Sequence, residues 1–553
     1  MMMRMKSKKQ LTLALALTLA LGGSVPVWAE HIQDKTLTEG DWTLKEKLYM
    51  EKSYITADQV SLDGSSISED ETYVTTGPVE IKQSTLEGKN GITFSNLKVQ
   101  AFNGQGYYPD PDHAVGLQGS TLSGKVITIE GASLAQNNGA SQLNGLYAEP
   151  GDDSINQKKL KNQLITDKLH IDGVKSNTAQ DVYGALLGAV ELRPYTKDGK
   201  ANVIVENVEN TTDSPEGTLA FGLVNTLGLI NIFNPDQSKD IPFVVTGKTQ
   251  IRNISSTKGS AVGTVLDGIS SYDMDHSHTD FHDLEISDIH GGDLSIGLYG
   301  GTGVVNVGNA DINMTGKDNE YAGLYTASAP DYKSANLKQF AIAGLFLGKF
   351  NLNNPEGNYT INGNVLADTG NKLPIVEAEY QFYKKQLDDP KTAKGQEEYL
   401  EAMVKGKKNS IQAIKERQYG SINLAGHLKL YGDIYAKNGG TVNLHLQDGS
   451  YFEGQADDYA DFDAAGQLTP RQVDVSSDLN NSAFGKRESW KSYADDAYAS
   501  YGVPRLNAGT INLTMDPGSK WQTRGKSFIT SLDFNHGGLV DTRKGHGVSV
   551  SIG

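Results

Sequence analysis

The densest group of potential metal ligands in this 553-residue chain lies between residues 273 and 283. Side chains two residues apart share one face of an extended segment, so His276, His278, Asp280 and His282 are expected on one side of a strand. Three imidazoles and a carboxylate could bind zinc or a similar ion. The chain has no cysteine and no His-Glu-x-x-His spacing. A solvated loop between strands therefore remains the favoured interpretation.

A second group of oxygen ligands begins at Asp461 and Asp463, which with Gly466 match the start of a calcium-binding loop. Ala465 stands where a third oxygen ligand is expected, and Gln472 stands where the bidentate Glu should be. An acidic insertion that is kept soluble by its charge is favoured over a calcium site.

Aromatic side chains gather in the same acidic stretch, where they could form a recognition surface for sugars or proteins. The members of this predicted surface are Tyr459, Phe462, Trp490, Tyr493 and Tyr498. The favoured alternative is that these rings pack the stretch against the rest of the protein.

Nothing in the sequence assigns a catalytic residue. The chain has no Gly-x-Ser-x-Gly turn, and carboxylate pairs are expected by chance among 67 acidic residues. We therefore expect no cofactor and no enzyme activity. Because polysaccharide-cleaving enzymes with solenoid folds exist, a secreted carbohydrate-active enzyme remains the alternative.

Two internal repeats predict the elements that hold these residues. The pattern Thr/Ser-Ile/Val-Asn begins at residues 360, 421, 441 and 510, and an apolar, Gly-containing element recurs at 219–224, 260–265, 294–299 and 321–325. Short strands that recur with Gly, Asn and Asp turns predict an all-β solenoid, in which each rung buries its apolar side chains on its neighbours. A set of separate β-sandwiches is the less favoured alternative.

The repeat also predicts the register. Because strand side chains alternate between faces, Ile422, Val442 and Ile511 should be buried in one stack, with Asn423, Asn443 and Asn512 beside them.

Two stretches interrupt the repeat. Residues 374–419 have helical spacing and predict a helical insertion, and residues 455–505 form an acidic, Tyr-rich insertion. The predicted organisation is an N-terminal cap at 30–52, β-helix at 53–373 and 420–454, and C-terminal rungs at 506–553. Because a solenoid accommodates extra chain only at its corners, both insertions should protrude from the rod and carry binding residues.

Residues 1–29 have the charged region, short apolar core and small-x-small site of a signal peptide. The chain is therefore expected to be exported. A net charge of -17 makes nucleic acid an unlikely partner, and no later apolar run is long enough to predict a membrane-spanning segment.

Residues 432–455 and 509–541 resemble the passenger region of type V autotransporters of Gram-negative bacteria, the pertactin-like adhesin group. The similarity is most specific around Trp521, Ser527, Leu532, the Gly537-Gly538 pair and Val540-Asp541. It implies a right-handed parallel β-helix that acts as an adhesin at the cell surface or outside the cell. The expected ligand is a host or bacterial surface protein or polysaccharide.

The family's C-terminal barrel is not evident after these rungs. Three explanations stay open: a fragment, export by a separate outer-membrane translocator, or retention in the periplasm.

Overall fold

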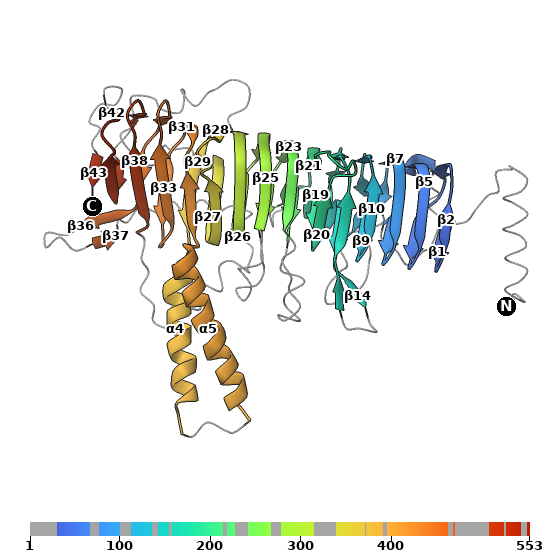
Figure 1. Cartoon of the computed structure of the whole chain (residues 1–553), viewed down its shortest axis with the longest axis horizontal. Helices are drawn as coiled ribbons and strands as arrows, with labels where there is room; N and C mark the ends of the chain where they lie inside the picture. The colour runs from blue at the N-terminus through green and yellow to red at the C-terminus, as the bar shows by residue number, and fades with distance from the viewer. Residues whose placement is uncertain are drawn as a thin grey trace, which may run out of the picture.

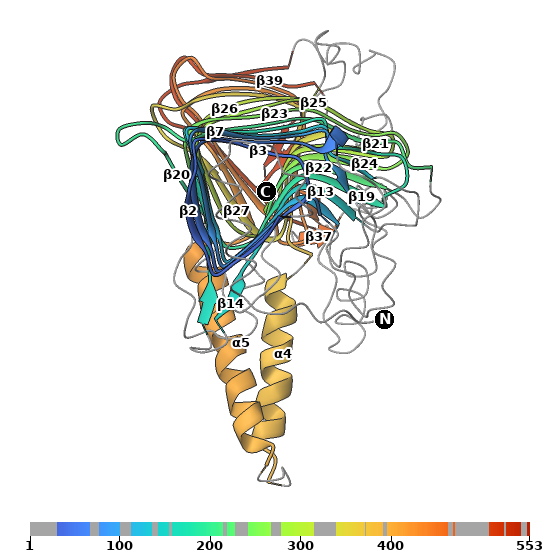
Figure 2. The ribbon, with the colours of Figure 1, turned by 90° about the vertical axis from the view of Figure 1, so that its right-hand side faces the viewer.

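The computed structural model describes residues 30–66, 77–99, 112–134, 142–153, 158–213, 218–226, 242–266, 278–314, 339–370, 372–390, 395–462, 468–470, 508–524, 527–542 and 550–552. Its main element is a 39-stranded sheet of parallel strands that coils into an elongated rod (Figure 1). Seen along the rod, the coil has a roughly triangular outline (Figure 2). This confirms the predicted parallel β-helix. The predicted signal peptide lies outside the described residues.

Each full turn of the coil passes through three faces, which we name A, B and C. Face A contains parts of β26 and β27 together with β1 (Glu30–Gln33), β4 (Leu48–Glu51), β6 (Val79–Lys82), β9 (His113–Gln118), β13 (Gln142–Glu149), β19 (Asp181–Leu187), β22 (Leu219–Asn225), β24 (Ser260–Leu266), β29 (Asn364–Asp368), β32 (Ile434–Lys437), β35 (Ala456–Asp457), β40 (Ser527–Ile529) and β43 (Val550–Ile552). Face B contains β2 (Thr36–Thr38), β10 (Thr121–Gly124), β16 (Asn162–Ile165), β20 (Val190–Arg193), β30 (Ser421–Leu424), β33 (Thr441–Leu446), β38 (Thr510–Met515) and β41 (Ser531–Phe534). Face C contains β3 (Asp41–Leu44), β11 (Val126–Glu130), β17 (Lys168–Asp172), β21 (Asn202–Asn210), β28 (Asn358–Asn362), β31 (His427–Tyr431), β34 (Tyr451–Glu453), β39 (Lys520–Gln522) and β42 (Leu539–Asp541).

Several long strands bend round a corner and serve two or more faces: β5 (Tyr54–Asp63), β7 (Thr85–Ser95), β23 (Phe243–Ser256), β25 (His278–Gly291), β26 (Leu294–Asn313) and β27 (Gln339–Leu352). Short strands β8 (Lys98–Val99), β12 (Ser133–Leu134) and β18 (Lys175–Ser176) follow face C, and η1 (Gly64–Ser66) is a single 3-10 turn. Two small antiparallel hairpins leave the coil, namely β14 (Gly151–Asp153) with β15 (Lys158–Leu160) and β36 (Ala460–Phe462) with β37 (Leu468–Pro470).

The corner after face C explains part of the turn composition. Asn96, Asn207, Asn253 and Asp288 each occupy it with a φ between 51° and 57°. Asn and Asp tolerate this left-handed conformation better than other residues with a side chain. A repeated Asn or Asp at the same corner therefore lets successive rungs turn alike.

The core confirms the predicted register on face B. Ile422, Val442 and Ile511 are at most 1% exposed, and their Cα positions are paired across β30, β33 and β38. The similar segment at residue 360 belongs elsewhere, because Ile361 pairs with Ile312 and Leu430 on face C. A three-residue pattern has the same alternation on every face, so it could not tell the faces apart.

The second repeat stacks on face A as predicted for three of its four copies, since β22 pairs with β24 and β24 pairs with β26. A Cβ atom on Gly222 would lie 2.4 Å from the carbonyl oxygen of Gly263. The glycine of this repeat therefore permits the close approach of adjacent rungs. The fourth copy, 321–325, lies outside the described residues, and Phe340 is the residue that pairs with Ile296.

The first predicted insertion is confirmed as a helical hairpin of α4 (Lys372–Leu387) and α5 (Glu397–Arg417), which projects from the rod (Figure 1). Its base is anchored by a cluster that includes Val376, Ile414 and Tyr419, with Val304 of β26 packed against it. Neither helix of the described chain is long and apolar enough to cross a membrane.

The parallel rungs continue through two stretches that the sequence analysis set apart. Within the predicted N-terminal cap at 30–52, β1 pairs with β4, and β2 and β3 pair with β5. At the predicted start of the acidic insertion, Ala456 pairs with Ile434 inside face A.

Candidate binding groove

A ladder of side-chain hydrogen bonds runs along the outside of face B. From the C-terminal end, the donor and acceptor residues are Ser531 to Asn512 (2.8 Å), Asn512 to Asn443 (2.9 Å), Asn443 to Asn423 (2.8 Å), Asn423 to Asn351 (2.9 Å), Asn351 to Asn306 (2.8 Å) and Asn306 to Asp280 (2.7 Å). Each asparagine donates through Nδ2 to the Oδ1 atom of the next rung toward the N-terminus. The predicted stack of Asn423, Asn443 and Asn512 is confirmed as part of this ladder.

Parallel pairing in register produces the ladder. Neighbouring rungs lie about 4.8 Å apart, which brings the amide of one asparagine within hydrogen-bonding distance of the next. Because all donors point the same way, the chain of amides ends on the carboxylate of Asp280, and that last hydrogen bond is charge-assisted. Aligned hydrogen bonds polarise one another, so the ladder should hold Asp280 in a fixed position.

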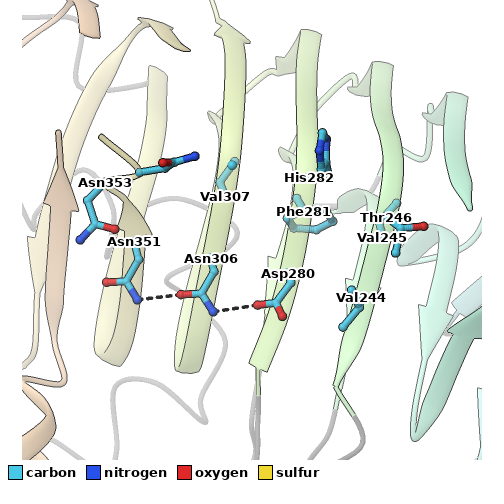
Figure 3. A pocket seen from close by; sticks show the side chains of 12 residues that line it. Val244, Val245, Thr246, Asp280, Phe281, His282, Asn306, Val307, Asn351 and Asn353 are labelled. Carbon is cyan, nitrogen blue, oxygen red and sulfur yellow. Dashed lines mark hydrogen bonds between the residues drawn. The ribbon is translucent and has the colours of Figure 1, made fainter. Parts of the chain in front are cut away.

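A groove of about 430 Å³ lies beside this end of the ladder (Figure 3). Its residues come from consecutive rungs and are Val244, Val245, Thr246, Asp280, Phe281, His282, Asn306, Val307, Gly308, Asn351, Asn353 and Asn354. We call it the Asp280 groove. Its volume falls within the range typical of small-molecule sites.

The groove presents one apolar side chain beside polar ones. Val244, Asp280 and Asn306 stand in register on consecutive rungs, whereas Val245, Phe281 and Val307 are at most 3% exposed because alternate side chains point into the core. Asp280 and Asn306 offer a carboxylate and a carboxamide along one side. Such a surface can bind a ligand through hydrogen bonds to Asp280 and Asn306 with an apolar contact at Val244, such as a sugar ring or a peptide.

The three predicted metal ligands that the structure describes do not converge on one point. His278, Asp280 and His282 lie on β25 as expected for an extended segment. His278 Nε2 is 3.5 Å from Asp280 Oδ2, whereas His282 Nδ1 is 2.9 Å from Asp283 Oδ2. His278 and His282 are four residues apart on one strand, which separates their backbones by about 13 Å, and no group of three converging metal-type ligands is found here among the described residues. His276 lies outside the described residues.

Asp283 is nevertheless well held. Burial would raise the pKa of its carboxyl, but hydrogen bonds from Asn309 and His282 hold that pKa below its ordinary value. The favoured interpretation of this segment as a loop is wrong from His278 onward, because the segment forms a rung.

The acidic insertion gives a mixed result. Asp461 and Phe462 belong to β36, while Asp463, Trp490, Tyr493 and Tyr498 lie outside the described residues. Tyr459 cannot belong to a recognition surface, because it is 1% exposed. Its ring lies 6.3 Å from that of Tyr435, with Lys437 Nζ 5.7 Å from its centre. This ring packs against face A, as the alternative interpretation expected.

Sequence reasoning missed a different group of metal-type ligands. His170, Asp172 and Glu206 have ligand atoms that all lie within 4.8 Å of one another. Asp172 pairs with Glu206 across β17 and β21. The sequence signal for this group is the pair His170 and Asp172, spaced two residues apart as on one face of a strand. Glu206 could be found only from the structure, because the number of residues between β17 and β21 sets which residue lies opposite Asp172.

Comparisons with protein-family models, with curated proteins and with solved structures gave no match to this chain. Its function therefore has to be inferred from its own residues and their geometry.

Proposed function

We propose that this chain is an exported adhesin-type binding scaffold similar to an autotransporter passenger. The observation that supports this most is the helical hairpin, which extends away from the regular rungs of the rod. A hairpin of this kind can reach a partner while the rod sets its position.

The rod has the properties of a stiff support. One continuous core runs from Ile32 to Ile529 and includes apolar side chains from all three faces. Each rung pairs with both of its neighbours through backbone hydrogen bonds, so bending the rod would break many contacts at once.

The hairpin has features of a contact element. Near its far end, Phe382 and Tyr399 are 44% and 60% exposed. Exposed aromatic rings are common anchors of protein interfaces. Between the helices, Lys407 Nζ lies 2.5 Å from Glu379 Oε2, with both side chains at least nine-tenths buried. This pair fixes the register of α4 against α5.

The proposed ligands are host or bacterial surface proteins or polysaccharides, bound at the hairpin or in the Asp280 groove. The proposed location is the cell surface or the medium, reached through a separate outer-membrane translocator where no barrel is joined to the chain. Binding of this kind requires no cofactor and no chemical step.

The experiment incubates the purified exported chain with immobilised polysaccharides and with intact cells. The proposal expects retention without new reducing or unsaturated ends. Phe382→Ala with Tyr399→Ala should weaken retention on cells, and Asp280→Asn should weaken retention on sugars, while the exposed control Gln381→Ala changes neither. New reducing ends would favour the carbohydrate-active enzyme instead, and no retention on any surface would contradict the proposal.

A further inference from the structure

Face C carries a cluster of three metal-type side chains on two adjacent rungs. His170 and Asp172 lie two residues apart on β17 and point to the same side of the sheet. Glu206 stands opposite Asp172 on β21. Its carboxylate reaches diagonally, so that Glu206 Oε1 lies 2.7 Å from His170 Nε2.

Unlike the residues of β25, these three converge. One ligand atom from each residue lies within 4.8 Å of those from the other two, and among the described residues this is the group of three that could share one ion. The side chains of His170 and Glu206 are 21% and 12% exposed. They therefore remain accessible to an ion while being largely shielded from solvent.

Neighbouring side chains already orient the carboxylates. Asn207 Nδ2 donates to Asp172 Oδ1 at 2.7 Å, and Arg252 Nε donates to Glu206 Oε2. These bonds engage Asp172 Oδ1 and Glu206 Oε2. Glu206 Oε1 pairs with His170 Nε2, and an ion bound between these two atoms would replace that hydrogen bond. Hydrogen bonds of this kind fix the geometry of ligands in known metal sites.

The charge of the surrounding column favours a cation. Glu130, Asp172 and Glu206 stand in register on three consecutive rungs, followed by Arg252 on the next rung. Like charges directly opposite one another destabilise a sheet. Three carboxylates and one guanidinium leave two negative charges, which a divalent cation would neutralise.

We propose that His170, Asp172 and Glu206 form a zinc-type divalent-cation site that joins two rungs of the rod. One imidazole nitrogen with two carboxylate oxygens suits zinc and its transition-metal neighbours better than calcium or magnesium, which prefer all-oxygen sites. With three protein ligands, water would complete the coordination. The ion would act as a staple between β17 and β21.

The test uses the full exported chain, free of any affinity tag and stripped of metal with a chelator. Zinc chloride and calcium chloride are titrated separately by calorimetry, and melting is followed by circular dichroism. The proposal expects one zinc ion per chain, a higher melting temperature with zinc, and weak or no binding of calcium.

Three variants separate this site from others. His170→Gln and Asp172→Asn should each weaken zinc binding by ~10-fold or more, as is usual when a metal site loses one of its supporting groups. His282→Gln removes an exposed histidine that pairs with Asp283, and it should leave the affinity unchanged. Copper bound to the wild-type chain should show coupling to one nitrogen in electron paramagnetic resonance, and this coupling should disappear in His170→Gln even if stability also changes.

Three results would overturn the assignment. Absence of saturable zinc binding would mean that His170 and Glu206 form a hydrogen-bonded pair only. Equal zinc affinity in His170→Gln would place the ion elsewhere, and calcium binding as tight as zinc binding would contradict the proposed ligand set.

Discussion

Replacing Val442 with Asp tests the register of the whole C-terminal half of the rod. Val442 is fully buried on β33, in register with Ile422 on one side and Ile511 on the other. Loss of its methyl packing should cost about 1–2 kcal/mol. A carboxyl group surrounded by aliphatic side chains stays neutral when folded, with its pKa raised above 7. At 1.36 kcal/mol per pH unit from an unfolded pKa of about 3.9, this adds about 4 kcal/mol at pH 7.

The pH dependence of this cost has a definite sign. Because the folded-state pKa is raised, the penalty grows as pH rises above the unfolded pKa and disappears below it. The gap in unfolding free energy between Val442→Asp and the wild type should therefore shrink by roughly 4 kcal/mol between pH 7 and pH 4. Urea denaturation followed by circular dichroism at both pH values measures this gap.

Asn443→Asp is the matched control. Asn443 is the next residue and points outward into the ladder, so a carboxylate there stays partly hydrated and should cost about 1 kcal/mol or less. A slip of one residue would exchange the two positions. The register is refuted if Asn443→Asp is the more damaging change, or if Val442→Asp unfolds at the wild-type urea concentration.

Three further changes probe separate features. Gly222→Ala places a Cβ atom 2.4 Å from the carbonyl oxygen of Gly263 and should lower the free energy of unfolding by about 1–3 kcal/mol. A variant that melts at the same temperature as the wild type would contradict this. Glu379→Ala removes the carboxylate that forms an ion pair with the buried Lys407 and should destabilise the hairpin by about 3–5 kcal/mol in hydrogen exchange. Glu379→Leu with Lys407→Met should restore protection. Burial raises the pKa of the Glu191 carboxyl, but hydrogen bonds from Lys161, Arg193 and Gln163 hold that pKa below its ordinary value. The ionised Glu191 therefore stabilises the folded protein above its unfolded-state pKa, and this stabilisation is lost as pH falls through the folded-state pKa. Glu191→Gln should lower the free energy of unfolding by about 1 kcal/mol at pH 7, and the variant and the wild type should become equally stable below pH 4. If the variant is still less stable than the wild type in acid, packing and not charge is responsible.

The rungs that could be predicted from the sequence are those with a repeated local pattern. Val442 and Ile511 sit in almost identical segments, so alternation alone placed them in the core. The helical hairpin was equally visible, because helical spacing replaced the strand pattern over a long stretch. In both cases the pattern lies within one short segment of sequence, because strand alternation and helical spacing are set by neighbouring residues.

The N-terminal half of the ladder was not predictable in this way. Consecutive ladder residues are 26 positions apart between Asp280 and Asn306, 45 between Asn306 and Asn351, and 72 between Asn351 and Asn423. Because loops and insertions change the length of each rung, no fixed period finds them. The Asp280 groove and the His170 cluster depend on this register across rungs, so only the folded structure brings their residues together.

Tyr459 shows the opposite failure. Its place in an acidic, aromatic stretch suggested a recognition surface, yet its backbone adopts a φ of 53° and its ring is buried. Composition indicates that aromatic rings are present, but it does not say which way the chain turns at each one.

Shortening the hairpin tests the central claim most directly. Removing residues 378–412 deletes the exposed rings and both members of the buried ion pair, while Val376, Ile414 and Tyr419 still cover the rod. Packed helices lie about 8–10 Å apart, so four Gly/Ser residues, which span up to about 13 Å, can join the cut ends. The measurement compares cell binding and thermal melting of this variant with the full chain. The account predicts unchanged cooperative melting with loss of most cell binding; loss of cooperative melting, or full binding without the hairpin, would contradict it.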